Sequence, residues 1–268
     1  MAANGTTLYA EVRGSGPAVL LIHAGGEDAE EWRPIAERLS GYTAVTYDRR
    51  GTLRSGRGDW PGQGSAQHAD DAAALLDGLH LRDVLVFGGS AGGIVALQLA
   101  LRSPRLIRRC LVFEPGYFRQ VPDGEAFVQP AHVAMKAHLA SRPGDWAGAY
   151  AAFGRAIVPT SASAPRGFFT QPKASGWYTE REDGNAEVLV RDDIPILTRE
   201  LVDEAALASA TVDIRFSFGA NSVSIFRDIT TRLSAVRGRT PDAIQGVGHS
   251  IYYHPDAAAA YIHSQADG

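Results

Sequence analysis

Residues 85–93 read LVFGGSAGG, and the expected fold follows from these nine residues and their neighbours. Its β-branched and aromatic residues are followed by a turn of small residues that carries Ser90, and then by the apolar, alanine-rich residues 94–101, which are typical of a helix. Gly88 and Gly92 are the outer glycines of the pattern G-x-S-x-G. Strand, sharp turn and helix in this order form a nucleophile elbow, which presents the serine hydroxyl at the end of a sheet. A glycine-rich turn that binds phosphate, or that only reverses the chain, is the alternative that this stretch alone leaves open.

The sequence around the elbow alternates between strand and helix patterns. An edge strand is expected at residues 7–13, buried strands at 18–22 and 42–47, further strands at 83–87 and 108–114, and helices at 30–39 and 66–79. After residue 205 the same alternation returns, with strands at 212–218 and 240–244 and helices at 226–236 and 256–262. Such alternation predicts an α/β fold with a mostly parallel central sheet and helices on both faces.

Residues 115–205 interrupt this pattern. Helical stretches are expected at 132–140 and 146–157, with a loop at 159–172, and we expect a mostly helical cap inserted into a core formed by residues 1–114 and 206–268. The aromatic residues of this segment are Tyr117, Phe118, Phe127, Trp146, Tyr150, Phe153, Phe168, Phe169, Trp177 and Tyr178. Two interpretations stand: they line an apolar pocket, or they form the core of the cap itself.

Composition limits the partners and the chemistry. The 268 residues are 45% hydrophobic and 21% charged with a net charge of −4, so no basic surface for nucleic acid or for an anionic membrane is expected. No apolar run approaches the length of a membrane span, and a cytoplasmic location is the default expectation. Cys110 is the only cysteine, it lies in an apolar run, and it is expected to be a buried structural thiol. The histidines show no metal-ligand spacing, and the serine chemistry that the motifs below imply needs neither a metal nor an organic cofactor, so none is expected.

Four motifs occur in an order that identifies a family resemblance. They are the loop His23-Ala24-Gly25-Gly26 after an early buried strand, Asp48-Arg49-Arg50-Gly51 after the next, the elbow Gly88-Gly89-Ser90-Ala91-Gly92, and the late Gly246-Val247-Gly248-His249. With them the chain resembles an enzyme of the α/β-hydrolase fold from end to end. The resemblance implies that Ser90 is the nucleophile, that His249 is the general base, and that the N–H groups of Gly25 and Ala91 form the oxyanion hole.

The acid of the triad departs from the commoner family pattern. Most relatives place it in the loop that here reads Gly219-Ala220-Asn221-Ser222, which contains no carboxylate. A minority, including haloalkane dehalogenases and zearalenone lactonases, places a glutamate at the end of the strand after the nucleophile helix, and Glu114 stands there. By this resemblance the catalytic triad is Ser90, Glu114 and His249. Glu114 as a plain strand-end carboxylate paired with an arginine is the alternative.

The likeness to the zearalenone lactonases extends to several short segments. They are Gly16-Pro17, Gly219-Ala220, Phe226-Arg227-Asp228-Ile229 and His254-Pro255-Asp256, whereas the cap matches poorly. The resemblance implies an esterase or lactonase that cleaves a largely apolar small molecule, with a zearalenone-like macrolactone as the narrower expectation. Because dehalogenases use an aspartate where this chain has Ser90, that activity is not expected. The alternative is a non-hydrolytic protein of the same fold, such as an acyltransferase, a cofactor-free dioxygenase or a binding protein. The sequence leaves the substrate-binding residues and the oligomeric state open.

Overall fold

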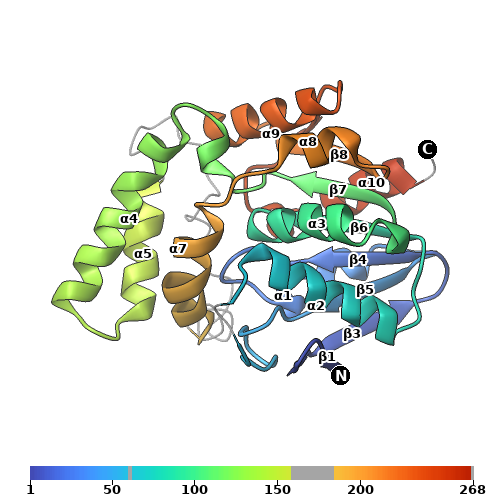
Figure 1. The fold of residues 1–268 in the computed structure, drawn as a ribbon, viewed down its shortest axis with the longest axis horizontal. Coiled ribbons are helices and arrows are strands. Elements are labelled where there is room, and N and C mark those ends of the chain that lie inside the picture. The colour runs from blue at the N-terminus through green and yellow to red at the C-terminus, as the bar shows by residue number, and fades with distance from the viewer. Residues whose placement is uncertain (60–61, 158–183, 267–268) are drawn as a thin grey trace.

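A seven-stranded sheet forms the centre of the protein, seen here in a computed structural model that describes residues 1–59, 62–157 and 184–266 (Figure 1). The strand order is β3-β5-β4-β6-β7-β8-β9, and only the pairing of β3 with β5 is antiparallel. The strands of this sheet are β3 (Ala10–Gly14), β4 (Ala18–Ile22), β5 (Thr43–Tyr47), β6 (Val84–Gly89), β7 (Ile107–Phe113), β8 (Asp213–Gly219) and β9 (Asp242–Ile244). The predicted mostly parallel α/β sheet is confirmed.

Strand β4 shows why these apolar runs form buried strands. All five of its residues are buried, and successive side chains point to opposite faces of the sheet. Leu20 and Ile22 enter the larger hydrophobic core, whereas Val19 and Leu21 enter the core on the other face. A strand covered on both faces therefore needs apolar residues at every position, which is the pattern that the sequence shows.

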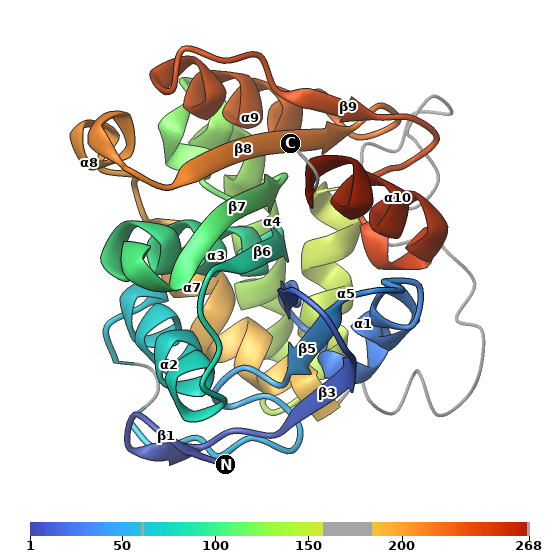
Figure 2. The same cartoon turned by 90° about the vertical axis from the view of Figure 1, so that its right-hand side faces the viewer.

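Helices cover both faces of the sheet (Figure 2). On one face lie α1 (Ala29–Ala36) and α10 (Pro255–Ala266), and on the other lie α2 (Ser65–Gly78), α3 (Ala91–Arg102) and α9 (Ser224–Val236). Helix α1 begins in a capping box, because the Asp28 carboxylate accepts from the N–H groups of Glu30 and Glu31 while the Glu31 side chain accepts from the N–H of Asp28. This cap fixes the end of the loop that follows β4.

The chain between β7 and β8 forms a group of helices beyond the carboxyl ends of the parallel strands (Figure 1). It contains α4 (Gly124–Ser141), α5 (Trp146–Ile157), a single π-helical turn η3 (Leu189–Asp193) and α7 (Ile194–Leu197), whereas α8 (Glu204–Ser209) lies beside α9, just before β8 begins. The predicted helix at 146–157 coincides with α5, and that at 132–140 is the second half of α4. The expected loop at 159–172 and the aromatic residues Phe168, Phe169, Trp177 and Tyr178 lie outside the described residues.

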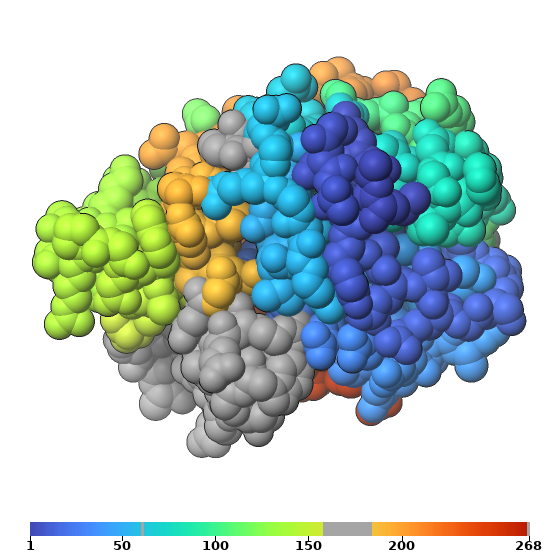
Figure 3. Space-filling model, turned by 90° about the horizontal axis from the view of Figure 1, so that it is seen from below, coloured from blue at the N-terminus to red at the C-terminus, as the bar shows by residue number. Residues whose placement is uncertain are grey.

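Polar contacts attach the end of this helical segment to the loops that follow β5. The Arg57 guanidinium forms an ion pair with Asp192, and the N–H of Ser65 donates to Glu200 Oε1 at 2.8 Å. In Figure 3 the surface of residues around 184–200 lies directly against that of the loop after β5. These contacts hold residues 192–200 against the loop after β5 and the start of α2.

Some elements differ from the sequence expectations. The expected edge strand at 7–13 is divided into β2 (Thr6–Thr7), which pairs with β1 (Ala2–Ala3), and β3. Cys110 is fully buried, which raises the pKa of its thiol, in agreement with a structural role. Within the described residues, no helix combines the length and the apolar character that crossing a membrane requires.

Candidate active site

Ser90 lies in a sharp turn between β6 and α3. Its backbone adopts a left-handed conformation, with φ of 51°, and its N–H donates to the carbonyl of Phe113 at 2.9 Å. A left-handed non-glycine residue costs about 1–2 kcal/mol, so the surrounding structure must hold it in place. The contacts at Gly92 show how: a Cβ there would lie 2.1 Å from the carbonyl oxygen of Ile22. The start of α3 is thus pressed against the end of β4, and this close approach requires glycine.

Glu114 is the first residue after β7, beside the elbow. Gly89 pairs with Phe113 in the sheet, so Ser90 and Glu114 follow neighbouring residues of two parallel strands. Glu114 is fully buried and also left-handed, with φ of 41°, and its N–H donates to Ser217 of β8 at 3.0 Å. The parallel register therefore brings both predicted residues to the same edge of the sheet.

Three donors surround the Glu114 carboxyl group. The N–H of Gly219 donates to Oε1 at 2.8 Å, and the Ser222 hydroxyl donates to Oε2 at 2.8 Å. The third contact joins His249 Nδ1 to Oε2 at 2.5 Å. Since Nδ1 then carries the proton, this contact fixes the imidazole tautomer and places Nε2 on the opposite side of the ring. The structure brings Glu114 and His249 together, and Ser222 rather than Asn221 contacts the carboxyl group from the loop after β8.

The His249 ring is also held from its face. Phe226, in α9, stacks on the imidazole with a centroid separation of 4.0 Å and an interplanar angle of 19°. Neither Ser222 nor Phe226 was predicted to contact the triad residues. In the sequence, Ser222 is only a small polar residue after a strand, and Phe226 is only an aromatic residue near the start of a helix. Residues of both kinds commonly occur at such positions without contacting an active site.

The two predicted oxyanion donors lie on adjacent segments. A Cβ built on Gly25 would lie 3.7 Å from the Cβ of Ala91. Among the described residues, no group accepts a hydrogen bond from the N–H of Gly25 or of Ala91. The neighbouring N–H of Ala24, in contrast, donates to Glu27 Oε2 at 3.0 Å. Gly25 and Ala91 therefore lie side by side at the N-terminus of α3, and the role of their N–H groups as oxyanion donors stays a prediction.

A pocket joins these groups. Ser90, His249, Gly25 and Ala91 line it together with mostly apolar side chains. Its apolar wall includes Ile94, Phe118, Phe153, Leu189, Ile194 and Leu197, most of them from the segment between β7 and β8. Three of the predicted aromatic residues, Phe118, Tyr150 and Phe153, do line the pocket, whereas Tyr117 is buried in the core. The described residues contain no cluster of histidine, cysteine and carboxylate side chains suited to a metal ion. The arrangement thus places a serine hydroxyl, an imidazole and two backbone N–H groups on the wall of one largely apolar pocket.

Comparison with known proteins identifies the family. Residues 17–183 match the family model described as alpha/beta hydrolase fold, and this match covers more than half of the chain. The chain therefore belongs to the α/β-hydrolase fold family. The motif order at the level of sequence and the fold of the described residues agree with this membership.

Individual relatives share part of the sequence or the whole fold. An uncharacterized hydrolase of Bacillus subtilis strain 168, YraK, is 40% identical over 113 residues, which are 41% of this chain and 42% of the relative. A putative carbamate hydrolase of Azorhizobium caulinodans, RutD, is 38% identical over 102 residues, 38% of each chain. The chain thus spans about two fifths of the length of these curated relatives. The solved structure of an α/β hydrolase from Sphaerobacter thermophilus is 26% identical with a TM-score of 0.74, over 97% of this chain and 96% of that one.

Replacing Gly92 tests the packing of the elbow. In Gly92→Ala the new Cβ would meet the Ile22 carbonyl at 2.1 Å, so we expect about 3 kcal/mol of lost stability. Gly184→Ala is the control, because a Cβ at Gly184 meets no atom within 4 Å. The free energy of unfolding of this variant should be unchanged or slightly raised. Urea unfolding of both variants measures the difference. A Gly92→Ala protein as stable as the wild type would contradict the described packing.

Proposed function

We propose that this protein is a serine hydrolase that cleaves an ester or lactone of a largely apolar small molecule through an acyl-enzyme. One observation carries the proposal: His249 Nδ1 lies 2.5 Å from the buried Glu114 carboxyl group, and His249 lines a pocket together with Ser90. Membership of the α/β-hydrolase fold family supports hydrolysis as the reaction class. The fold alone would be a weak argument, because one fold hosts many functions.

The first step of the proposed reaction forms the acyl-enzyme. The Ser90 hydroxyl attacks the carbonyl carbon of the substrate while His249 takes the hydroxyl proton, since a serine is a weak nucleophile without an adjacent base. Glu114 orients the imidazole and stabilises the imidazolium. The N–H groups of Gly25 and Ala91 donate to the oxyanion of the tetrahedral intermediate. Collapse of this intermediate breaks the bond to the leaving oxygen, which receives the proton from His249.

The second step releases the acid. Water gives a proton to His249 and attacks the acyl carbon, and the Ser90 oxygen leaves with that proton. In a lactone the leaving alcohol and the acid remain one molecule, so the product is a ring-opened hydroxy acid. The site residues named here supply all the proton transfers of both steps.

The pocket supports an apolar substrate, because aromatic and aliphatic side chains form most of its wall. A zearalenone-like macrolactone remains the narrower hypothesis from the sequence resemblance. The relative described as a putative carbamate hydrolase adds carbamates as a class to test, since they present a carbonyl carbon to the same nucleophile. The strongest argument for the non-hydrolytic alternative is that the loop after β8 has Asn221 where most relatives carry the acid, and the contact between Glu114 and His249 weakens that argument.

Ser90→Ala tests the nucleophile. Wild-type protein should hydrolyse members of a panel of p-nitrophenyl esters, lactones, macrolactones and carbamates, and Ser90→Ala should lower turnover by about 10⁴-fold or more. A fluorophosphonate probe should label the wild type and fail to label the variant. Labelled Ser90→Ala protein would contradict the assignment, and wild-type protein without turnover or labelling would favour the non-hydrolytic alternative. Turnover restricted to short acyl esters would count against a macrolactone substrate.

A pair of variants tests the acid. Glu114→Gln keeps the shape of the side chain but turns an amide group toward the three donors, so we expect kcat to fall by about 10³- to 10⁴-fold. Asn221→Ala is the matched control in the loop where most relatives carry the acid, and it should change kcat little. Steady-state kinetics with one good ester measure both effects. The reverse pattern would transfer the role of the acid away from Glu114.

A further inference from the structure

The peptide bond between Ala24 and Gly25 is held by two side chains outside the triad. The Ala24 carbonyl accepts from His23 Nδ1 at 2.7 Å and from Arg49 Nη2 at 3.2 Å. A peptide unit is planar and trans, so its N–H points away from its C=O. Two donors that fix the direction of the Ala24 carbonyl therefore also fix the direction of the Gly25 N–H, which is the proposed oxyanion donor.

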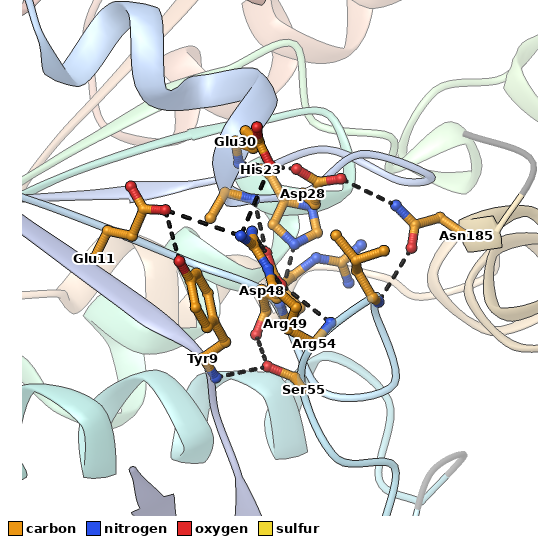
Figure 4. Close-up of polar contacts among 12 residues, drawn as sticks. Tyr9, Glu11, His23, Asp28, Glu30, Asp48, Arg49, Arg54, Ser55 and Asn185 are labelled. Carbon is orange, nitrogen blue, oxygen red and sulfur yellow. Dashed lines mark hydrogen bonds and ion pairs between the residues drawn. The ribbon is translucent and has the colours of Figure 1, made fainter. Parts of the chain in front are cut away.

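The hydrogen-bond network determines which nitrogen of His23 carries the proton. The backbone N–H of Arg49 donates to His23 Nε2 at 3.0 Å, so Nε2 must be the acceptor (Figure 4). Nδ1 of a neutral ring then carries the hydrogen and donates to Ala24. Burial and the nearby Arg49 guanidinium hold the pKa of His23 well below its usual range, which keeps the ring neutral.

The Arg49 guanidinium is itself anchored by a carboxylate from the π-helical turn η3. Its Nη2 donates to Asp193 Oδ2 at 2.6 Å, and the two side chains are only 1% and 3% exposed. Burial would raise the pKa of Asp193, but Arg49 and His68 outweigh it and hold that pKa well below its usual range. Asp193 also lines the pocket. One buried ion pair thus connects the pocket wall with the peptide that precedes the oxyanion donor.

Leu189, in η3, and Asn185, just before it, also contact the loop that carries Gly25 or the residues beside it. A Cβ on Gly25 would lie 2.8 Å from Leu189 Cδ1, so the Leu189 side chain packs directly over the Gly25 backbone. Asn185 contacts both neighbouring loops, because its Nδ2 donates to Asp28 Oδ2 at 3.4 Å and its Oδ1 accepts from the N–H of Leu53 at 3.1 Å (Figure 4). The segment from 185 to 193 therefore has a defined position over the loop that carries Gly25.

We propose that Arg49, anchored by Asp193, is a positioning residue that orients the 24–25 peptide so that the Gly25 N–H is directed at the oxyanion. This inference rests on the proposed hydrolase function. A cationic donor on the Ala24 carbonyl also polarises the peptide unit, which makes its N–H a stronger donor. Without the guanidinium, only His23 restrains the carbonyl, and small misalignments of catalytic groups can reduce rates by up to about 10²-fold.

Arg50 provides a matched control beside Arg49. Its guanidinium is fully buried and forms two hydrogen bonds with Asp71, at 2.7 and 2.5 Å. Its other bonds go to the carbonyls of Asn4 and Gly58, and among the described residues it has none to the loop that carries Gly25. The control variant Arg50→Met removes a buried ion pair of the same kind and leaves the contacts of the loop that carries Gly25 in place. Arg50→Met with Asp71→Leu replaces both partners by apolar groups, in case the single variant fails to fold.

The kinetic test compares Arg49→Met, Arg49→Lys and Asp193→Asn with the Arg50 control. Active sites are counted by the burst of p-nitrophenol, and kcat per active site is measured with the best ester of the panel. We expect Arg49→Met to lower kcat by about 10- to 100-fold with little change in KM. The affinity of a trifluoromethyl ketone, whose adduct with Ser90 has an oxyanion, should fall by the same factor. Arg49→Lys should recover part of the loss, and the Arg50 control should keep wild-type kcat per active site.

A second readout does not depend on turnover. In ¹H–¹⁵N spectra, the Gly25 amide resonance should shift in Arg49→Met and remain in place in the Arg50 control. Wild-type kcat per active site in Arg49→Met, or an equal loss in the Arg50 control, would overturn the positioning role. An unshifted Gly25 resonance in Arg49→Met would overturn it as well. If wild-type protein neither hydrolyses esters nor reacts with the fluorophosphonate, the proposed function fails, and the Gly25 resonance still decides whether Arg49 orients the peptide.

Discussion

The hydrogen bond between His249 and Glu114 is the interaction on which the proposed chemistry depends. It joins the residue after β7 to the loop after β9, and the donors from Gly219 and Ser222 add the end of β8 to the same carboxyl group. Three neighbouring strands thus converge on one buried acid. A buried carboxyl group without such donors would cost several kcal/mol, so the sheet edge and the site stabilise each other.

The remaining part of the site is set by close packing of the backbone. The start of α3 lies against β4, at a distance that only a glycine at position 92 allows. The same packing brings Ala91 beside Gly25, so one contact between a helix and a strand places both proposed oxyanion donors. The loop that contains Gly25 is in turn covered by the segment around η3, and the Arg49–Asp193 ion pair joins this part of the pocket wall to the same loop. Leu189 and Asp193, which line the pocket, therefore also support the loop that carries the proposed oxyanion donor Gly25.

Much of this architecture is predictable from local sequence, and the exceptions have a physical cause. Strand β4 and helix α5 were predicted with their observed bounds, because periodicity and turn residues are local signals. Glu114 was named through the family resemblance, at the end of a predicted strand, and parallel pairing with β6 converts that position into proximity to Ser90. The π-helical turn has no local signature, and Arg49 pairs with Asp193 across a separation of 144 residues. Contacts of that kind are created by tertiary packing, so a single sequence could not identify them.

The hydrogen bond between His249 and Glu114 can be tested through the proton resonance of the His249 Nδ1–H group. A short hydrogen bond to a carboxylate moves such a proton far downfield. We expect a downfield exchangeable resonance in the wild type that is lost in Glu114→Gln and retained in Asn221→Ala. A resonance that persists in Glu114→Gln and disappears in Asn221→Ala would contradict it, because the partner of His249 would then come from the loop after β8.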